Sequence, residues 1–123
     1  MDKPRAPFAF EGLDRVFHER ARLGIMSSLA GHPDGLAFVD LKSLCGLTDG
    51  NLNRHLQVLV EAGYLLIEKE FEGGRSSTRC RLSTEGRVRF SDYLTVLETV
   101  LRKATKETAR ATGSARRVSR QTG

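Results

Sequence analysis

One short segment of the chain, residues 48–63, collects polar side chains whose chemistry suits the edges of DNA bases. The amides of Asn and Gln can form paired hydrogen bonds with adenine, and the guanidinium of Arg can do so with guanine. A glycine among them lets a phosphate approach the backbone, where the N–H groups of a helix start can bind it. The candidate DNA contacts of this segment are Thr48, Gly50, Asn51, Asn53, Arg54 and Gln57. Together they could read a base sequence if one helix presented them on the same side.

The segment has the pattern of such a helix. At about 100° per residue, Leu52, Leu56 and Leu59 fall on one stripe, and the polar candidates fall on the other side. Thr48 suits the N-cap and Gly63 suits the end of the helix. Amphipathic helices are more often structural than DNA-reading, so the neighbouring elements must decide between these two interpretations.

The elements before this helix would make it part of a helix-turn-helix. Apolar spacing predicts a first helix from residue 13 or 14 to residue 29, ended by the turn 31–35 with its glycines and proline. Residues 36–38 could form a short strand, and Asp40 could cap a two-turn helix that ends at Gly46. A short helix, a turn with glycine and a longer helix follow the order of that motif. In it, the N-terminal end of the second helix enters the major groove.

The chain then changes to the pattern of a β-hairpin. Two alternating stretches, 64–71 and 77–83, flank a loop with two glycines. Arg75 stands in the loop, and alternation places Arg79 and Arg81 on one exposed face. An arginine on a flexible tip suits a narrow minor groove, although a glycine turn and a solvated arginine face are the simpler alternatives. The candidate DNA contacts of this wing, at about residues 71–78, are Arg75, Ser76, Ser77 and Arg79.

A long last helix predicts that two copies of the chain associate. Ser83 suits its N-cap, and apolar residues recur in a near-heptad stripe as far as about residue 106. One small domain would struggle to cover this stripe, although it could also pack on its own core. The candidate dimer contacts, which include the N-terminal arm and the first helix, are Phe8, Phe10, Val16, Phe90, Tyr93, Leu94, Leu97, Val100 and Leu101.

The predicted fold class is mainly α with a small β-hairpin (α+β): a winged helix-turn-helix with a long C-terminal dimerisation helix. We expect a flexible arm over residues 1–12, the winged helix domain over 13–106 and a disordered basic tail over 107–123. The net charge is +5, but seven of the 20 Lys and Arg residues and only one of the 15 acidic residues lie in 102–123. General basicity is therefore weak evidence for nucleic acid, and the local clusters must support it.

Other functional classes find little support. No apolar run is long enough to cross a membrane, and the N-terminus lacks the apolar stretch of a signal peptide, so a cytoplasmic, nucleoid-associated protein is expected. Cys45 and Cys80 stand apart, and no histidine has metal-ligand spacing, so neither a metal nor a cofactor is expected. Both cysteines are most simply buried apolar residues, with a single-cysteine redox switch as the alternative. No nucleophile–base pair or phosphate loop indicates an enzyme.

On these motifs the sequence resembles small single-domain winged-helix transcriptional regulators of the MarR/ArsR type. The matching segments are residues 41–56, 59–65, 73–75 and 82–87. The resemblance covers about residues 13–102. It implies a homodimer that binds double-stranded DNA to repress or activate genes, and proteins of this type can also bind a small-molecule effector. The alternative is a winged-helix module that docks on another protein without reading a DNA sequence.

Overall fold

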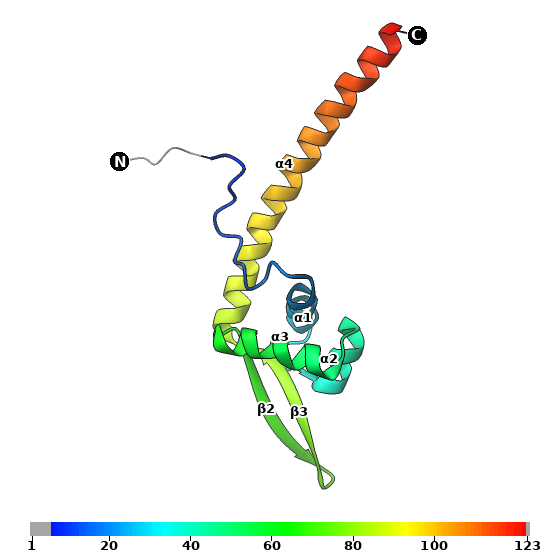
Figure 1. Cartoon of the computed structure of the whole chain (residues 1–123). Helices are drawn as coiled ribbons and strands as arrows, with labels where there is room; N and C mark the ends of the chain where they lie inside the picture. Colours follow the sequence, from blue (N-terminus) through cyan, green and yellow to red (C-terminus); the bar gives the residue numbers. More distant parts are fainter. Residues whose placement is uncertain (1–5, 123) are drawn as a thin grey trace, which may run out of the picture.

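The helices and strands follow the predicted order along the chain. The computed structural model describes residues 6–122, with the side chains of residues 6–71 and 73–113. The hairpin and the last helix project in opposite directions from a group of three short helices (Figure 1). The elements are α1 (Arg20–Ala30), β1 (Leu36–Ala37), α2 (Phe38–Cys45), α3 (Asp49–Glu61), β2 (Leu65–Glu72), β3 (Arg75–Leu82) and α4 (Thr84–Thr122). This arrangement confirms the predicted winged helix.

Aromatic rings join the short helices to α4. Phe17, in the turns before α1, is fully buried. The rings with centroids within 5.5 Å of its own include those of Tyr64, Phe90 and Tyr93. The apolar stripe of α3 enters the same core with Leu52, Leu56 and Leu59. Each such side chain contributes roughly 1.5–3 kcal/mol on burial, so the core holds α3 by its apolar side and leaves its polar side outside.

The first helix is shorter than predicted. It begins at Arg20 because the Glu19 carboxylate caps it, accepting hydrogen bonds from two backbone N–H groups of the first turn at 3.1 and 3.2 Å. The preceding residues form turns instead of helix. There the Asp14 carboxylate accepts hydrogen bonds at 2.9 Å from a backbone N–H two residues on and from the hydroxyl of Tyr64. The predicted start at residue 13 or 14 is therefore wrong.

The helix-turn-helix forms as predicted except for one cap. Gly46 ends α2 with φ +62°, a left-handed conformation that glycine adopts without strain. The Thr48 hydroxyl caps α3 by accepting a hydrogen bond from the N–H of Asn51 at 3.2 Å. Asp40 does not cap α2, because the helix begins directly after β1 with Ala37 as its N-cap, and Asp40 lies in its first turn.

The three strands form an antiparallel sheet in the order β1-β3-β2. β1 confirms the predicted short strand and pairs Leu36 with Cys80. β2 and β3 pair from Leu65–Leu82 to the tip, so the hairpin is longer than predicted and its loop is only Gly73-Gly74. Their φ values of +58° and +77° are the pair of positive angles that the tight turn of a twisted hairpin requires.

The last helix is also longer than predicted. The Ser83 hydroxyl caps it by accepting a hydrogen bond from the N–H of Gly86 at 2.9 Å. The helix continues to Thr122, past the predicted end near residue 106 and through the segment whose composition predicted a disordered tail. Alanine, arginine and lysine are strong helix formers, so a segment with few apolar residues can still be helical. Between residues 6 and 122, neither α4 nor any other helix is long and apolar enough to cross a membrane.

The described part of the N-terminal arm lies along α4 (Figure 1). The Lys103 ammonium donates a hydrogen bond to the carbonyl oxygen of Pro7 at 2.9 Å. The same ammonium lies 5.6 and 5.7 Å from the ring centroids of Phe8 and Phe10, within the range of cation–π attraction. Residues 1–5 and 123 lie outside the described residues.

Candidate nucleic-acid interface

The polar side of α3 is exposed and carries every DNA contact predicted for this helix. The exposed residues are Thr48, Gly50, Asn51, Asn53, Arg54 and Gln57. A Cβ added at Gly50 would meet no atom within 4 Å, so the backbone of the first turn is openly accessible. Gln57 makes only a long contact of 3.4 Å with Glu61. The amide and guanidinium groups of this face are thus available to an external partner.

An ion pair offsets the negative charge of the one acidic side chain in the first turn of α3. The Asp49 carboxylate would repel a phosphate at the helix N-terminus. The Lys42 ammonium of α2 lies 2.8 Å from it, across the turn of the motif. Both side chains are partly exposed, so the pair contributes little to stability. Its consequence for binding is that α3 begins with nearly neutral side chains.

Behind the polar face, His55 joins α3 to the start of α1. Its side chain is buried, and its Nδ1 lies 3.2 Å from Nη1 of Arg22 and 3.5 Å from the Glu19 carboxylate. The guanidinium of Arg54 lies 3.5 Å from the other ring nitrogen. Burial lowers the pKa of His55, the two arginines lower it further and the Glu19 carboxylate opposes them. The ring is therefore neutral at pH 7 and serves to orient α3, not to bind a phosphate.

The arginine face of the wing is paired within the chain. Glu68 and Glu70 of β2 lie on the same strand face as Arg79 and Arg81 of β3. Arg79 lies 3.0 Å from the Glu70 carboxylate and donates a hydrogen bond to the carbonyl oxygen of Gly35 at 3.0 Å. Arg81 pairs with Glu68. Without DNA, the Arg79 guanidinium thus ties the wing to the loop before β1, and its predicted contact with DNA would require it to leave these partners.

The opposite face of the wing carries two residues that the sequence interpretation missed. Lys69 and Phe71 lie on the strand face of Leu65, which is buried in the core, and both are exposed near the tip. Among the residues whose side chains are described, none forms an ion pair with Lys69. Side chains alternate along a strand, so counting every second residue from the buried Leu65 places Lys69 and Phe71 on one face and Glu68 and Glu70 on the other. This signal was present in the sequence. Arg75, Ser76 and Ser77 are exposed at the tip, as predicted.

The order of elements and the exposed face of α3 find a match among known protein families. A family model for a winged helix DNA-binding domain matches residues 21–101, well over half of the chain. The chain belongs to the winged helix DNA-binding domain family. Members of this family are DNA-binding domains and not enzymes, as the sequence predicted.

Individual winged helix proteins show the same likeness. The chain is 35% identical over 80 residues to an uncharacterized protein, MJ0432, of Methanocaldococcus jannaschii, a match that covers 65% of this chain and 86% of that protein. A transcriptional regulator homologue of Pyrococcus horikoshii is 25% identical with a TM-score of 0.69, over 74% of this chain and 89% of that one. MepR of S. aureus, solved with DNA, shares the fold at 15% identity and a TM-score of 0.64, over 89% and 88% of the two chains.

The predicted dimer residues of this winged helix chain separate into two groups. Phe90 and Tyr93 are 3% and 1% exposed and pack around Phe17 of the same chain, so they are removed from the proposed interface. The heptad stripe could not distinguish a protomer's own core from a partner. The remaining candidates are all at least partly exposed: Phe8, Phe10, Val16, Leu94, Leu97, Val100 and Leu101.

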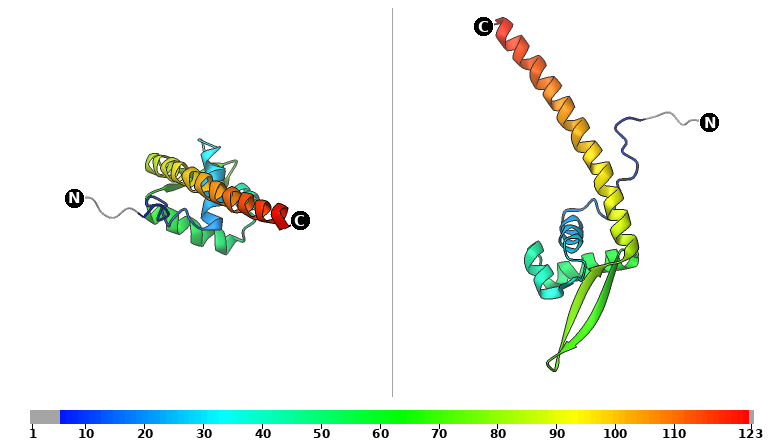
Figure 2. Two further views of the ribbon diagram at one scale, coloured as in Figure 1. Left: turned by 90° about the horizontal axis from the view of Figure 1, so that it is seen from above. Right: turned by 180° about the vertical axis from the view of Figure 1, so that it is seen from behind.

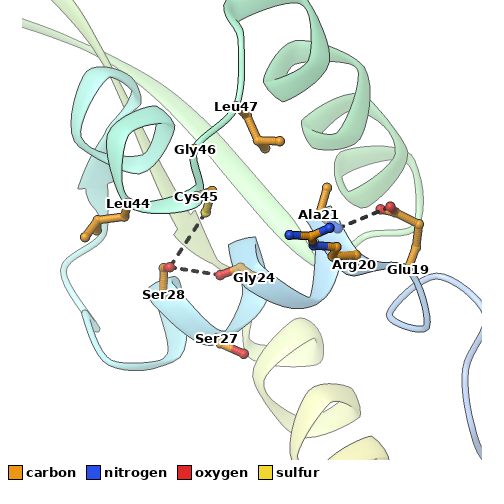
Figure 3. A pocket seen from close by; sticks show the side chains of 10 residues that line it. All are labelled: Glu19, Arg20, Ala21, Gly24, Ser27, Ser28, Leu44, Cys45, Gly46 and Leu47. Atoms are coloured by element: carbon orange, nitrogen blue, oxygen red, sulfur yellow. Dashed lines mark hydrogen bonds between the residues drawn. The ribbon is translucent and has the colours of Figure 1, made fainter.

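A cavity of about 680 Å³ opens between α1, the end of α2 and the turn before α3 (Figure 3). Its lining includes Arg20, Ser28 and Cys45, and the Cys45 sulfur lies 3.8 Å from the Ser28 hydroxyl. Cys80 of β3 is buried, and burial raises the pKa of its thiol to about 11, which keeps it protonated and unreactive. In the described part of the chain, no group of three His, Cys, Asp or Glu residues could hold a metal ion.

Proposed function

We propose that this winged helix protein is a transcriptional regulator that binds a specific duplex sequence as a homodimer. The N-terminal half of α3 would enter the major groove, and the wing would lie on the minor groove or the backbone. The observation that carries the proposal is the row of exposed amide and guanidinium groups on α3, with Asn51 and Arg54 at its centre. These groups lie on a helix whose apolar side is buried, so their positions are fixed before DNA binds.

The apolar surface of α4 supports the homodimer. Leu94 and Leu101 are exposed and lie seven residues apart, on the same side of the helix. Past Lys103, where the N-terminal arm contacts it, α4 projects alone in the described part of the chain (Figure 2). Packing α4 against its counterpart would bury these leucines and set two copies of α3 in a two-fold arrangement, which suits a pseudo-palindromic site.

A solved neighbour supports the mode of binding. The MepR structure contains DNA, so a protein of this fold can accommodate a duplex. The NadR structure, which also shares the fold, contains 4-hydroxyphenylacetate. If the present protein takes a small-molecule effector, we propose the cavity between α1 and α2, because its volume lies in the range of about 300–1,000 Å³ common for ligand pockets.

Selection of DNA sites from random duplexes tests the proposal. The wild-type protein should enrich one sequence with approximate two-fold symmetry, and its affinity should fall steeply with salt because phosphate contacts release counterions. The exposed cations of α4 could bind DNA without specificity, so a variant with Lys106→Gln and Arg110→Gln serves as the control and should enrich the same sequence. If no sequence is enriched, the protein is instead a winged-helix module that docks on another protein.

A further inference from the structure

The tip of the wing exposes a phenylalanine that the proposed readout by α3 does not use. We propose that Phe71 is an apolar wedge that enters the minor groove beside the site of α3 and partly unstacks one base step. This inference rests on the proposed function, because it requires a specific DNA site. It adds to that function a residue that deforms the DNA, so the affinity of the protein would depend on how easily the DNA bends.

The exposure of Phe71 is the first observation. Its side chain is 80% exposed, more than any of the other exposed large apolar residues. Single exposed apolar residues are common, but Phe71 lies near the end of β2, in a hairpin that projects from the body of the domain (Figure 1). Phe71 pairs with Ser76 in the register of the hairpin, one residue pair away from the turn. The ring therefore lies close to the tip of the wing, just before the turn.

The shape of the tip is the second observation. The turn consists of Gly73 and Gly74, and a Cβ added to either would meet nothing within 4 Å. The tip is therefore a bare backbone turn surrounded by open space. The minor groove is only about 6 Å wide, so a tip without side chains can approach its floor. Proteins that bind there often insert phenylalanine or another apolar side chain between two base pairs.

The charges beside the ring identify the partner as DNA and not an apolar protein surface. Lys69 lies on the same strand face two residues before Phe71, and Arg75 lies on the other side of the turn. Both are exposed. The ring shares its strand face with Lys69, and Arg75 lies on the opposite face of the tip, so both faces of the tip carry a cation. Such a tip matches a groove whose floor is formed by stacked bases and whose two walls carry phosphates. Farther from the tip on the face of Arg75, the Arg79 guanidinium is already paired with the Glu70 carboxylate.

A base preference follows from the energetics of a wedge. Pyrimidine–purine steps such as TA and CA are the easiest to unstack and kink. The DNA selected by the wild-type protein should therefore carry such a step under each wing, at a position that no side chain of α3 reaches. A Phe71→Ala protein has no wedge, so its selected sites should lose the preference at that step and keep the preference under α3.

Fluorescence of 2-aminopurine measures the unstacking directly. The base is placed at successive positions under the wing in the duplex selected by the wild-type protein. Binding of the wild type should raise the fluorescence at one step, Phe71→Leu should keep part of the rise and Phe71→Ala should abolish it. Loss of one aromatic–base contact should also lower affinity about tenfold. Leu66→Ala is the matched control, because Leu66 is an exposed apolar residue on the other face of β2 and should change neither signal.

The outcomes separate this inference from the function beneath it. Phe71 is so exposed that its removal should leave the fold intact, and an unchanged unfolding temperature will establish this. If the wild type selects a site but Phe71→Ala gives the same fluorescence and affinity, the proposal that Phe71 is a wedge is wrong. The proposal that the protein is a sequence-specific regulator is then unaffected. If the wild type selects no site, both the regulator and the wedge are overturned.

Discussion

His55 of α3 and Arg22 of α1 meet beneath the exposed polar face of α3, with 3.2 Å between the imidazole Nδ1 and a guanidinium nitrogen. A neutral imidazole accepts a hydrogen bond at one nitrogen only. A guanidinium only donates, so the tautomer that forms the shorter Arg22 hydrogen bond is the one that accepts at Nδ1 and carries its proton on Nε2. The contact connects the capped start of α1 to the middle of α3, so it fixes the angle at which the reading face is held.

The contacts of His55 predict that the free energy of unfolding decreases as the pH is lowered. Because the pKa of His55 is lowered in the folded state, the unfolded chain, with a histidine pKa of about 6.5, takes up a proton first as the pH falls. The free energy of unfolding of the wild type should decline below that pH until the folded ring also protonates. Urea unfolding between pH 7.5 and 5 should show a steeper decline than in His55→Gln. Parallel curves for the two proteins would mean that His55 titrates as it does in the unfolded chain.

The local parts of the fold could be predicted from the sequence because their causes are local. The α3 helix is bounded by Thr48 and Gly63 and faces the core with regularly spaced leucines, so its limits and its orientation were both confirmed. The turn at Gly46 and the cap at Ser83 likewise depend on residues within four positions of each other. The same periodicity placed Asn51 and Arg54 on the exposed face.

The parts that failed depend on partners far along the chain. The turns that stand in place of the predicted start of the first helix include Asp14, which accepts a hydrogen bond from the hydroxyl of Tyr64, 50 residues away. The ion pair of Arg79 was not predicted, because alternation reveals the face of Arg79 but not the Glu70 carboxylate across the hairpin. Phe71 was overlooked because exposure at a wing tip depends on where the sheet leaves the core. Periodicity in the sequence indicates on which face of a helix or strand a residue lies. Which residue contacts it on that face depends on the tertiary fold.

Arg54 and Arg75 should affect binding in different ways. Arg54 lies on the reading face, so Arg54→Ala should weaken binding to the selected site by about 1–3 kcal/mol and relax the preference at one base pair. Arg75 lies at the wing tip, so Arg75→Ala should weaken binding to all sequences and reduce the salt slope by about 1. Fluorescence anisotropy with the selected duplex and a scrambled one, at several salt concentrations, measures both. Loss of base preference in Arg75→Ala alone would assign the readout to the wing.

Arg79→Ala should act on stability and not on the salt dependence. Its hydrogen bond to the Gly35 carbonyl and its ion pair with Glu70 are partly exposed, so their loss should lower the free energy of unfolding by about 0.5–1.5 kcal/mol. The salt slope of DNA binding should stay at the wild-type value, in contrast to Arg75→Ala. A reduced slope with unchanged stability would show that Arg79 leaves its partners to contact a phosphate.

Gly86 in the first turn of α4 should tolerate no side chain. A Cβ there would lie 2.0 Å from the carbonyl oxygen of Tyr64, and the backbone cannot move without disturbing the buried rings. Gly86→Ala should destabilise the fold by about 1–3 kcal/mol. Gly113→Ala, in the same helix but with no atom within 4 Å, should instead be about 0.5–1 kcal/mol more stable. Thermal unfolding of both variants checks the contrast, and equal effects would contradict it.

The proposed dimer should depend on the exposed leucines of α4. Replacing both Leu94 and Leu101 by glutamate places two charges on the surface that α4 would bury, and unpaired charges are strongly unfavourable in an interface. Sedimentation at micromolar concentration should show a dimer for the wild type and a monomer for this variant. Val88→Glu is the control, because Val88 is also exposed but lies about 120° around the helix from Leu94. It should remain a dimer. A monomeric wild type would refute the dimer, and each α3 would then bind its half of a site independently.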